Sequence, residues 1–131
     1  MDYVLDASAL MAFFEDRVGG EKVEELLSKA AEAKRPLLMS VINWGEVYYA
    51  IWRARGEKAA NSKLQETAQL PIELVDVDAE LARLAASLKA QHDLPYADCF
   101  AAALAQTRKA LLVTSDKDFE LLGGKLKTLW L

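Results

Sequence analysis

Hydrophobic and polar positions follow two periodicities that alternate along the chain. Short apolar runs bounded by Gly, Pro or charged residues predict strands, and longer segments with apolar residues three or four positions apart predict helices. The predicted strands are residues 3–5, 37–39, 72–75, 111–114 and 126–130. The predicted helices are residues 8–17, 21–34, 43–55, 58–70, 78–91 and 95–108, followed by a short helix at 119–122.

Strands that alternate with helices indicate an α/β fold in which helices cover both faces of a central parallel sheet. We therefore predict a three-layer α/β/α architecture with roughly five strands, built by a single domain that spans residues 1–131. In sheets of this kind the ligand site lies beyond the carboxyl ends of the strands.

Composition and charge narrow the class of protein. An apolar content of 53% over 131 residues excludes a disordered chain and allows a buried core. No apolar stretch approaches the ~20 residues of a membrane span, and no basic segment precedes the first apolar run, so neither a membrane anchor nor a signal peptide is expected. The single cysteine suits a reducing cytoplasm. The net charge of −4 argues against broad nucleic-acid binding unless the negative charge is gathered at a metal site.

Four acidic residues stand where apolar elements begin or end: Asp6, Glu46, Asp98 and Asp116. Asp6 and Asp116 follow predicted strands, whereas Glu46 and Asp98 lie in the first turns of predicted helices. Carboxylates in these places can converge on one end of a sheet, where two of them about 4 Å apart repel by roughly 4 kcal/mol at an effective dielectric of about 20. A hard divalent cation such as Mg²⁺ or Mn²⁺ relieves that repulsion.

Each acid also has an ordinary structural interpretation. Asp6 can cap a helix, and Asp98 in a first helical turn complements the helix dipole. Glu46 can be a solvated helix position, and Asp116 and Asp118 can form a turn and cap the short helix that follows. Taken singly, these interpretations compete with a metal site, but the similar context of the four acids favours the metal site.

The segments around these acids resemble the sequence motifs of PIN domains, in the order and at the spacing of that family. The four segments are LDASAL at 5–10, SVINWGEV at 40–47, LPYADCFAAA at 94–103 and LVTSDKDF at 112–119. One such motif is a weak indication, but four in order over nearly the whole chain are specific. The small size is most similar to the VapC toxins of toxin–antitoxin pairs.

The resemblance implies a metal-dependent endoribonuclease that leaves a 5′-phosphate and a 3′-hydroxyl. It implies Mg²⁺ as the cofactor, with Mn²⁺ as a substitute, and RNA as the substrate. It also implies a small antitoxin and a second copy of the chain as partners. The acids expected to bind the metal and to serve catalysis are Asp6, Glu46, Asp98 and Asp116. The residues expected to support them are Ser8, Thr114 and Asp118.

The predicted helix at 43–55 carries a further indication. An apolar arc is expected to pack at least partly on the sheet, while its aromatic residues are also typical of a partner-binding surface. The residues of the arc are Trp44, Val47, Tyr48, Ile51 and Trp52, and the residues on the opposite side are Glu46, Tyr49 and Arg53. The pattern leaves open whether Trp52 faces the core, a dimer mate or an antitoxin. The basic residues expected to contact the RNA backbone are Arg53, Arg55 and Lys117.

Other enzyme classes find little support among the residues. His92 is the only histidine, so a histidine-pair ribonuclease is excluded and a Ser-His-Asp triad would have to use it. Cys99 is interpreted as a small buried thiol, and no glycine segment has the Lys-Ser/Thr of a P-loop. A phosphatase with Asp6 as nucleophile would usually carry an acid where Ser8 stands. A solitary RNA-processing nuclease and a non-enzymatic α/β binding module stay open as alternatives.

Overall fold

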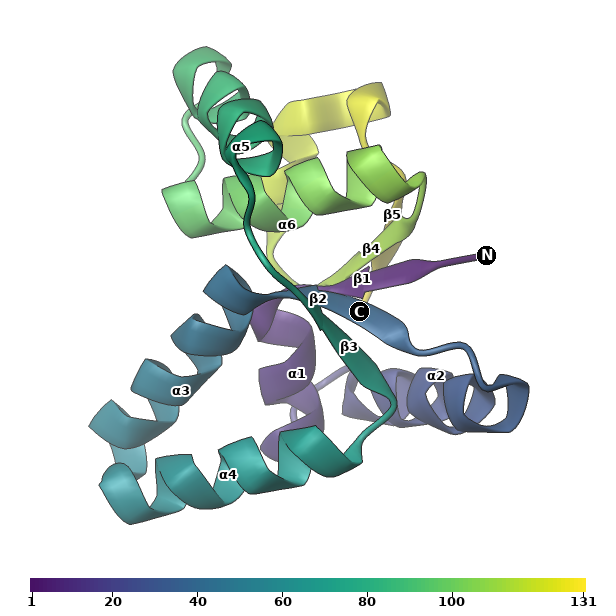
Figure 1. Cartoon of the computed structure of the whole chain (residues 1–131), viewed down its shortest axis with the longest axis vertical. Coiled ribbons are helices and arrows are strands. Elements are labelled where there is room, and N and C mark those ends of the chain that lie inside the picture. Colours follow the sequence, from purple (N-terminus) through teal and green to yellow (C-terminus); the bar gives the residue numbers. More distant parts are fainter.

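A five-stranded parallel sheet forms the centre of the protein. The computed structural model describes every residue from Met1 to Leu131. The strands are β1 (Tyr3–Leu5), β2 (Leu37–Ser40), β3 (Ile72–Val75), β4 (Leu111–Thr114) and β5 (Thr128–Trp130). Their order in the sheet is β3-β2-β1-β4-β5, and every pairing is parallel (Figure 1). The predicted α/β fold with a parallel sheet is confirmed.

The order of the strands reverses at β1, so that the strands before and after the reversal lie on opposite sides of it. From β1 the chain passes to β2 and β3 on one side, and it then returns to β4 and β5 on the other side. Val4 pairs with Leu38 of β2 and with Leu112 of β4, so β1 lies at the centre. Beyond the carboxyl ends of β1 and β4 the two connections diverge, and such a switch point is where open α/β sheets bind ligands.

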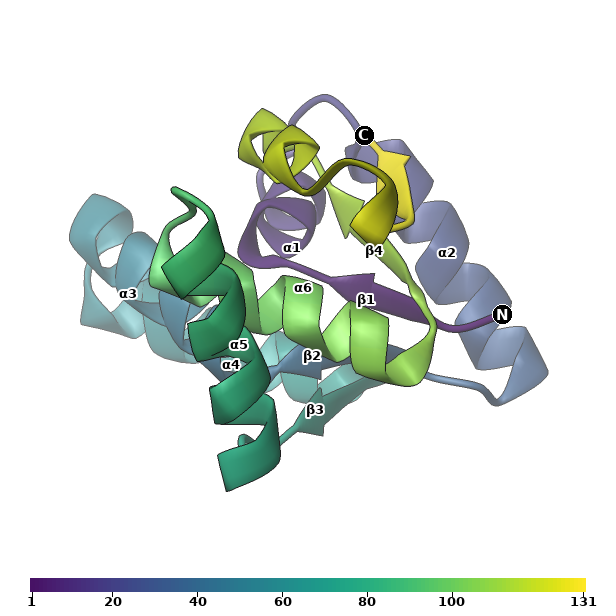
Figure 2. The same cartoon turned by 90° about the horizontal axis from the view of Figure 1, so that it is seen from above.

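Helices cover both faces of the sheet. The α-helices are α1 (Ala7–Phe14), α2 (Gly20–Ala33), α3 (Val41–Arg55), α4 (Glu57–Gln69), α5 (Ala79–Gln91) and α6 (Tyr96–Arg108), and a 3₁₀ segment, η1, covers Lys117–Lys125. Helices α5 and α6 lie on one face with η1, and α1 and α2 lie on the other, where α3 and α4 extend the layer (Figures 1 and 2). No helix combines the length and the apolar character that a membrane crossing demands.

Successive strand residues point to opposite faces and contribute to separate parts of the core. Val4 and Leu112 pack with residues of α5 and α6. Leu5 and Val113 pack with residues of α2, and Met39 joins a third group with α1, α3 and α4. Because these strands are buried on both faces, they are unbroken apolar runs in the sequence.

Some element boundaries differ from the predicted ones, and one difference affects the acids. The Ser40 side chain caps α3 by accepting the N–H of Ile42 at 3.2 Å. Helix α3 therefore begins at Val41, and Glu46 lies in its second turn instead of the predicted first turn. The first helix ends at Phe14 because the chain turns at Asp16, which has a φ of 49°. The predicted short helix at 119–122 is the longer η1 segment, and β5 begins after the predicted position 126.

Candidate metal centre

The four predicted acids come from elements that meet at the carboxyl end of the sheet. Asp6 directly follows β1, and Asp116 follows the last residue of β4 by two positions. Glu46 comes from α3 and Asp98 from the first turn of α6, and these two helices contact one another (Figure 1). The acids therefore surround the switch point between β1 and β4, where the topology favours a ligand site.

Asp6 is both a structural cap and a member of this acidic cluster. Its side chain is only 3% exposed. Oδ1 accepts the N–H of Ala9 at 2.9 Å, which caps α1, and also accepts the hydroxyl of Ser8 at 2.7 Å. Oδ2 accepts the hydroxyl of Thr114 at 2.5 Å. The capping interpretation is thus confirmed, and it does not compete with a metal site because one carboxylate can accept several bonds.

Two hydroxyl groups join the ends of β1 and β4. Ser8 Oγ accepts the N–H of Ser115 at 3.0 Å, and Thr114 Oγ1 accepts the N–H of Asp116 at 2.9 Å. Both hydroxyls donate to Asp6, as described above. The turn after β4 is therefore fixed against the start of α1, and the backbone that carries Asp116 is held in place.

Three carboxylates form the tightest part of the cluster. Carboxyl oxygens of Asp98, Asp116 and Asp118 all lie within 4.8 Å of one another. Asp98 is 9% exposed, and its Oδ2 is buried without a hydrogen-bond partner. Asp116 caps η1 by accepting the N–H of Asp118 at 2.9 Å, as the structural interpretation predicted. Asp118, expected only to support the site, thus lies as close to Asp98 as a ligand would.

Glu46 is held by a residue that the sequence analysis did not single out. The amide of Asn43 donates to Glu46 Oε1 at 2.8 Å and to the backbone carbonyl of Ala97 at 3.1 Å. Asn43 is fully buried. A polar residue three positions before an acid, inside an apolar helix start, is the sequence pattern that indicates such a contact.

Burial, more than the neighbouring charges, raises the pKa values of three acids of the cluster. Burial raises the pKa of Asp98 to about 8, and a hydrogen bond shared with Asp116 and the nearby negative charges contribute in the same direction. Burial also raises the pKa of Asp6 to about 6, although the hydrogen bonds from Thr114 and Ser8 lower it. Burial raises the pKa of Glu46, against the lowering effect of Asn43. The site therefore holds protons near neutral pH unless another cation replaces them.

This set of donors fits a hard divalent cation. All the side-chain donors are carboxylate oxygens, which Mg²⁺ and Mn²⁺ prefer. The unpaired Oδ2 of Asp98 lacks any protein partner for its charge, and an isolated buried carboxylate is costly. A cation would give that oxygen a partner and offset the repulsion among the acids.

The three basic residues expected to contact RNA lie in different settings. Arg53 lies over the ring of Tyr49 at 5.0 Å, on the same side of α3 as Glu46. Arg55 forms an ion pair with Glu15 at 3.3 Å, beyond the end of α1. No ion pair is formed by Arg53 or by Lys117, which directly follows Asp116. Arg53 and Lys117 are therefore the more available of the three.

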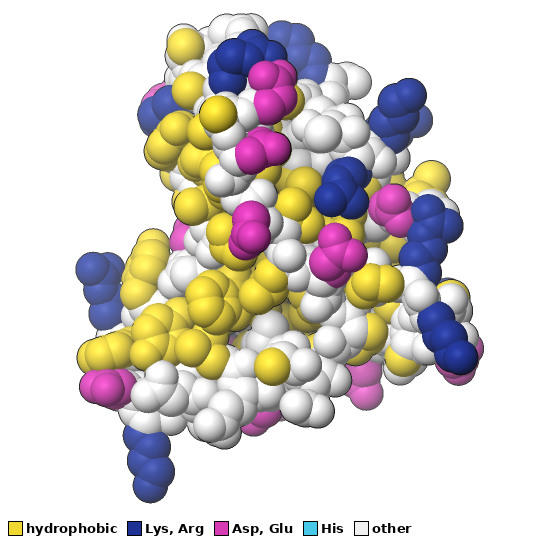
Figure 3. Space-filling view, viewed as in Figure 1, with side chains coloured by type: hydrophobic (Ala, Val, Ile, Leu, Met, Phe, Trp, Pro, Cys, Tyr) yellow, Lys and Arg dark blue, Asp and Glu magenta, His cyan; other side chains and the backbone are white.

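The apolar arc of α3 is only partly buried. Val47 and Ile51 belong to the core, and Tyr48 packs against it. Trp52 is 43% exposed and lies edge-on to Tyr48, with ring centroids 5.6 Å apart. Hydrophobic side chains gather along α3 in the space-filling view (Figure 3). Trp52 thus faces away from the core of its own chain.

The remaining chemical groups offer no rival site. Cys99 is fully buried, as predicted, and burial raises the pKa of its thiol. His92 Nε2 is buried without a partner, and no hydrogen bond joins His92 to a serine or an acid, which excludes a triad. The largest cavity, of about 400 Å³, lies at the turn between α1 and α2, and none of the cavities is lined by the four predicted acids. No enclosed cavity therefore surrounds the acids.

Comparisons with known proteins point to one family. The model of the PIN domain matches residues 3–125. A comparison with curated protein sequences gave no match.

Several solved structures share the fold. One of these structures is VapBC2 from Rickettsia felis bound to a DNA fragment from its promoter. The matching chain is 21% identical to this chain, with a TM-score of 0.77, and the match covers 100% of this chain and 99% of that of VapBC2. VapBC from Salmonella typhimurium, bound to DNA, is 16% identical, with a TM-score of 0.77 and coverage of 98% and 97%. VapC20 from Mycobacterium tuberculosis, described as a sarcin-ricin loop cleaving toxin, is 20% identical, with a TM-score of 0.69 and coverage of 93% and 95%. At these identities the likeness is one of fold.

Proposed function

Because this chain belongs to the PIN domain family, we propose that it is a Mg²⁺-dependent endoribonuclease, with Mn²⁺ as a working substitute. The observation that carries the proposal is the buried carboxylate of Asp98, which has an unpaired oxygen and lies against Asp116 and Asp118. Such an arrangement is costly in an apo protein and useful when a cation is bound. The proposed metal-site and catalytic acids are Asp6, Glu46, Asp98 and Asp116.

A Mg²⁺ ion at this site would neutralise the charge of the scissile phosphate and lower the pKa of a bound water molecule. The residues of the chain orient the acids. Ser8 and Thr114 hold both oxygens of Asp6, and Asn43 holds Glu46. Asp118 lies close enough to Asp98 and Asp116 to serve as a further ligand.

The proposed reaction is hydrolysis without a covalent protein intermediate. The oxygen of a water molecule forms a bond to phosphorus, the bond between phosphorus and the 3′ oxygen breaks, and the 3′ oxygen takes up a proton. The products are a 5′-phosphate and a 3′-hydroxyl. No serine or cysteine of the cluster is needed as a nucleophile, in keeping with the use of both site hydroxyls as donors to Asp6.

We propose that the RNA backbone approaches along α3 and past the turn after β4. Arg53 extends the side of α3 that carries Glu46, and Lys117 stands next to Asp116. The positive charges of Arg53 and Lys117 would offset the repulsion between the acidic site and the phosphates of RNA. Arg55 was also expected to contact RNA, but its ion pair with Glu15 makes it a weaker candidate.

Cleavage of RNA by the purified protein tests the enzymatic proposal. Wild-type protein is expected to cut a structured RNA when Mg²⁺ or Mn²⁺ is present and to stop when EDTA is added. Asp98→Asn keeps the volume of the side chain and removes its charge, so cleavage should disappear. The matched control is Asp93→Asn, an exposed aspartate in the loop that precedes α6, which should cleave as the wild type does. Full cleavage by Asp98→Asn would contradict the proposal, and equal cleavage by all three proteins in EDTA would indicate a contaminant.

We further propose that the chain is the toxin of a toxin–antitoxin pair. VapBC complexes are among the structures that share its fold. The exposed aromatic residues Tyr49 and Trp52, next to Glu46 on α3, offer a surface for a small antitoxin or a second copy of the chain. An arginine from such a partner would pair well with the acids and compete with the metal. The proposal assigns the protein to the cytoplasm, where RNA is found.

Expression in bacteria tests the toxin proposal separately from the nuclease proposal. The wild-type chain alone is expected to arrest growth, whereas Asp98→Asn should not. The product of the adjacent reading frame should co-purify with the chain and restore growth. Unchanged growth without any co-purifying protein would favour the solitary RNA-processing nuclease. If mutation of the acids left a measured cellular function intact, the non-enzymatic binding module would be favoured instead.

A further inference from the structure

One fully buried side chain joins the two helices that carry Glu46 and Asp98. Asn43 is the third residue of α3 and is 0% exposed. Its Nδ2 donates to Glu46 Oε1 at 2.8 Å and to the carbonyl of Ala97 at 3.1 Å. An amide nitrogen has two hydrogens, so each bond uses one of them. Ala97 directly precedes Asp98, and the second bond therefore reaches the peptide that carries this acid.

The folding of the helices alone does not explain this residue. The cap of α3 is already provided by Ser40, so Asn43 is not needed at the helix start. Asparagine is also a weak helix former. Its Oδ1 is buried without a partner, which is a cost that a well-packed apolar residue would avoid. Unpaired buried groups of this kind point to a requirement other than stability.

We infer that Asn43 is a positioning residue that sets the separation of Glu46 and Asp98. One amide group orients the Glu46 carboxylate and fixes the first turn of α6 relative to α3. For its effect on catalysis this inference rests on the proposed metal-dependent nuclease. The bond to Glu46 itself is a property of the metal-free protein and does not depend on that function.

The main test replaces Asn43 with leucine, which has a similar size and no polar atoms. Asn43→Leu should weaken Mn²⁺ binding, measured by calorimetry, by about 10–100-fold, the usual effect of losing a partner of a metal ligand. It should lower kcat while leaving KM for RNA nearly unchanged, because the RNA contacts are elsewhere. The melting temperature of the metal-free protein should fall little, since the unpaired Oδ1 is removed at the same time.

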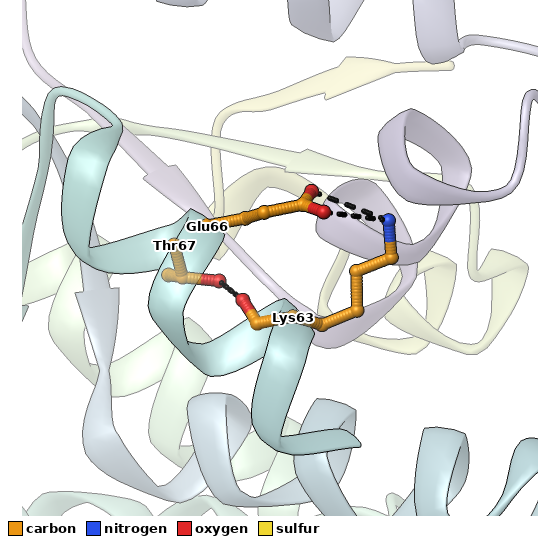
Figure 4. A network of polar contacts seen from close by, with 3 residues as sticks. All are labelled: Lys63, Glu66 and Thr67. Atoms are coloured by element: carbon orange, nitrogen blue, oxygen red, sulfur yellow. Dashed lines mark hydrogen bonds and ion pairs between the residues drawn. The ribbon is translucent and has the colours of Figure 1, made fainter. Parts of the chain in front are cut away.

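A matched control separates positioning from the general loss of a buried hydrogen bond. Thr67 is also buried and donates its hydroxyl to the carbonyl of Lys63 at 2.8 Å, within α4 (Figure 4). Thr67→Val removes that bond but should leave the Mn²⁺ affinity and kcat as in the wild type. Wild-type Mn²⁺ affinity and kcat in Asn43→Leu would overturn the inference.

Two measurements on metal-free protein keep this inference distinct from the proposed function. In a double-mutant cycle with Asn43→Leu and Glu46→Ala, the changes in melting temperature should not add, because the two residues are in contact. In nitrogen-15 NMR spectra of the wild type, the side-chain amide protons of Asn43 should exchange slowly with solvent. Additive changes, or fast exchange if the variants do not fold, would overturn the inference. Failure of the wild type to bind Mn²⁺ or cut RNA would instead refute the proposed function, and the cycle would still decide the role of Asn43.

Discussion

Replacement of Asp98 by asparagine should stabilise the metal-free protein. The pKa of Asp98 rises from its ordinary value of 3.8 to about 8 in the folded state, chiefly through burial and also through Asp116. Because the folded-state pKa is the higher one, folding favours the protonated acid. The contribution of Asp98 to the stability of the fold is then fully present below about pH 4 and is lost as the pH rises through about 8. Asparagine resembles the protonated acid in shape and can donate to Asp116, so it escapes this loss.

The size of the effect follows from the width of the shift. Each pH unit between the two pKa values costs at most about 1.4 kcal/mol, which gives an upper limit of roughly 5 kcal/mol at about pH 7.5. Partial screening by solvent at the edge of the cluster reduces this to about 2 kcal/mol. For a chain of this length that corresponds to a rise in melting temperature of roughly 6–8 °C. At about pH 5 the gain should shrink to about a third, because only a third of the pH interval has then been crossed.

Thermal unfolding in EDTA measures this difference. Wild type, Asp98→Asn and the exposed control Asp93→Asn should be compared at about pH 7.5 and about pH 5, and then in saturating Mn²⁺. Asp93→Asn should unfold with the wild type, and Mn²⁺ should reverse the order of wild type and Asp98→Asn because the metal binds only the native wild-type site tightly. An Asp98→Asn protein that unfolds at or below the wild-type temperature in EDTA at the higher pH would refute the reasoning.

Four further outcomes are expected. Millimolar Mn²⁺ should raise the melting temperature of the wild type, because a ligand at a hundred times its dissociation constant adds about 2.7 kcal/mol to the free energy of unfolding. An unchanged melting curve would count against the metal site. Asp6→Asn should abolish cleavage and keep the fold, as judged by circular dichroism. Thr114→Val removes a hydrogen bond that lowers the pKa of Asp6. The pKa of Asp6 should therefore rise, and the acidic limb of the pH–activity profile should move to a higher pH than in the wild type. Arg53→Gln should raise KM for RNA and flatten its salt dependence, whereas Arg55→Gln, already paired with Glu15, should change KM less; the reverse ranking in salt titrations would remove Arg53 from the RNA path.

The fold and the position of the acids were predictable because they depend on local patterns. Strands buried on both faces are continuous apolar runs, as Leu111–Thr114 is, and their alternation with amphipathic helices specifies a parallel sheet. In a parallel sheet every strand ends at the same edge, which accounts for the convergence of Asp6 and Asp116. The capping roles of both residues followed from the same strand-to-helix positions.

The contacts that complete the site depend on which elements become neighbours, and no local pattern reports that. The bond of Asn43 to Glu46 follows from their local spacing, but its second bond, to Ala97 of another helix, lies 54 positions away in the sequence and could not be predicted. The ion pair of Arg55 could not be predicted because its partner Glu15 lies just beyond the end of α1, which only the packed structure brings near. The exposure of Trp52 was left open for the same reason, since periodicity places a residue on one side of a helix but does not say what covers it.

The hydrogen bond between Asp6 and Thr114 joins residues that are 108 positions apart in the chain. During synthesis on a ribosome, the first of these residues emerges long before the second. Asp116 and Asp118 arrive later still, and β4 must pair with β1 before they can face Asp6 and Asp98. A partly synthesised chain therefore contains acids but no assembled site. The proposed nuclease would therefore become active only when its own translation is almost complete.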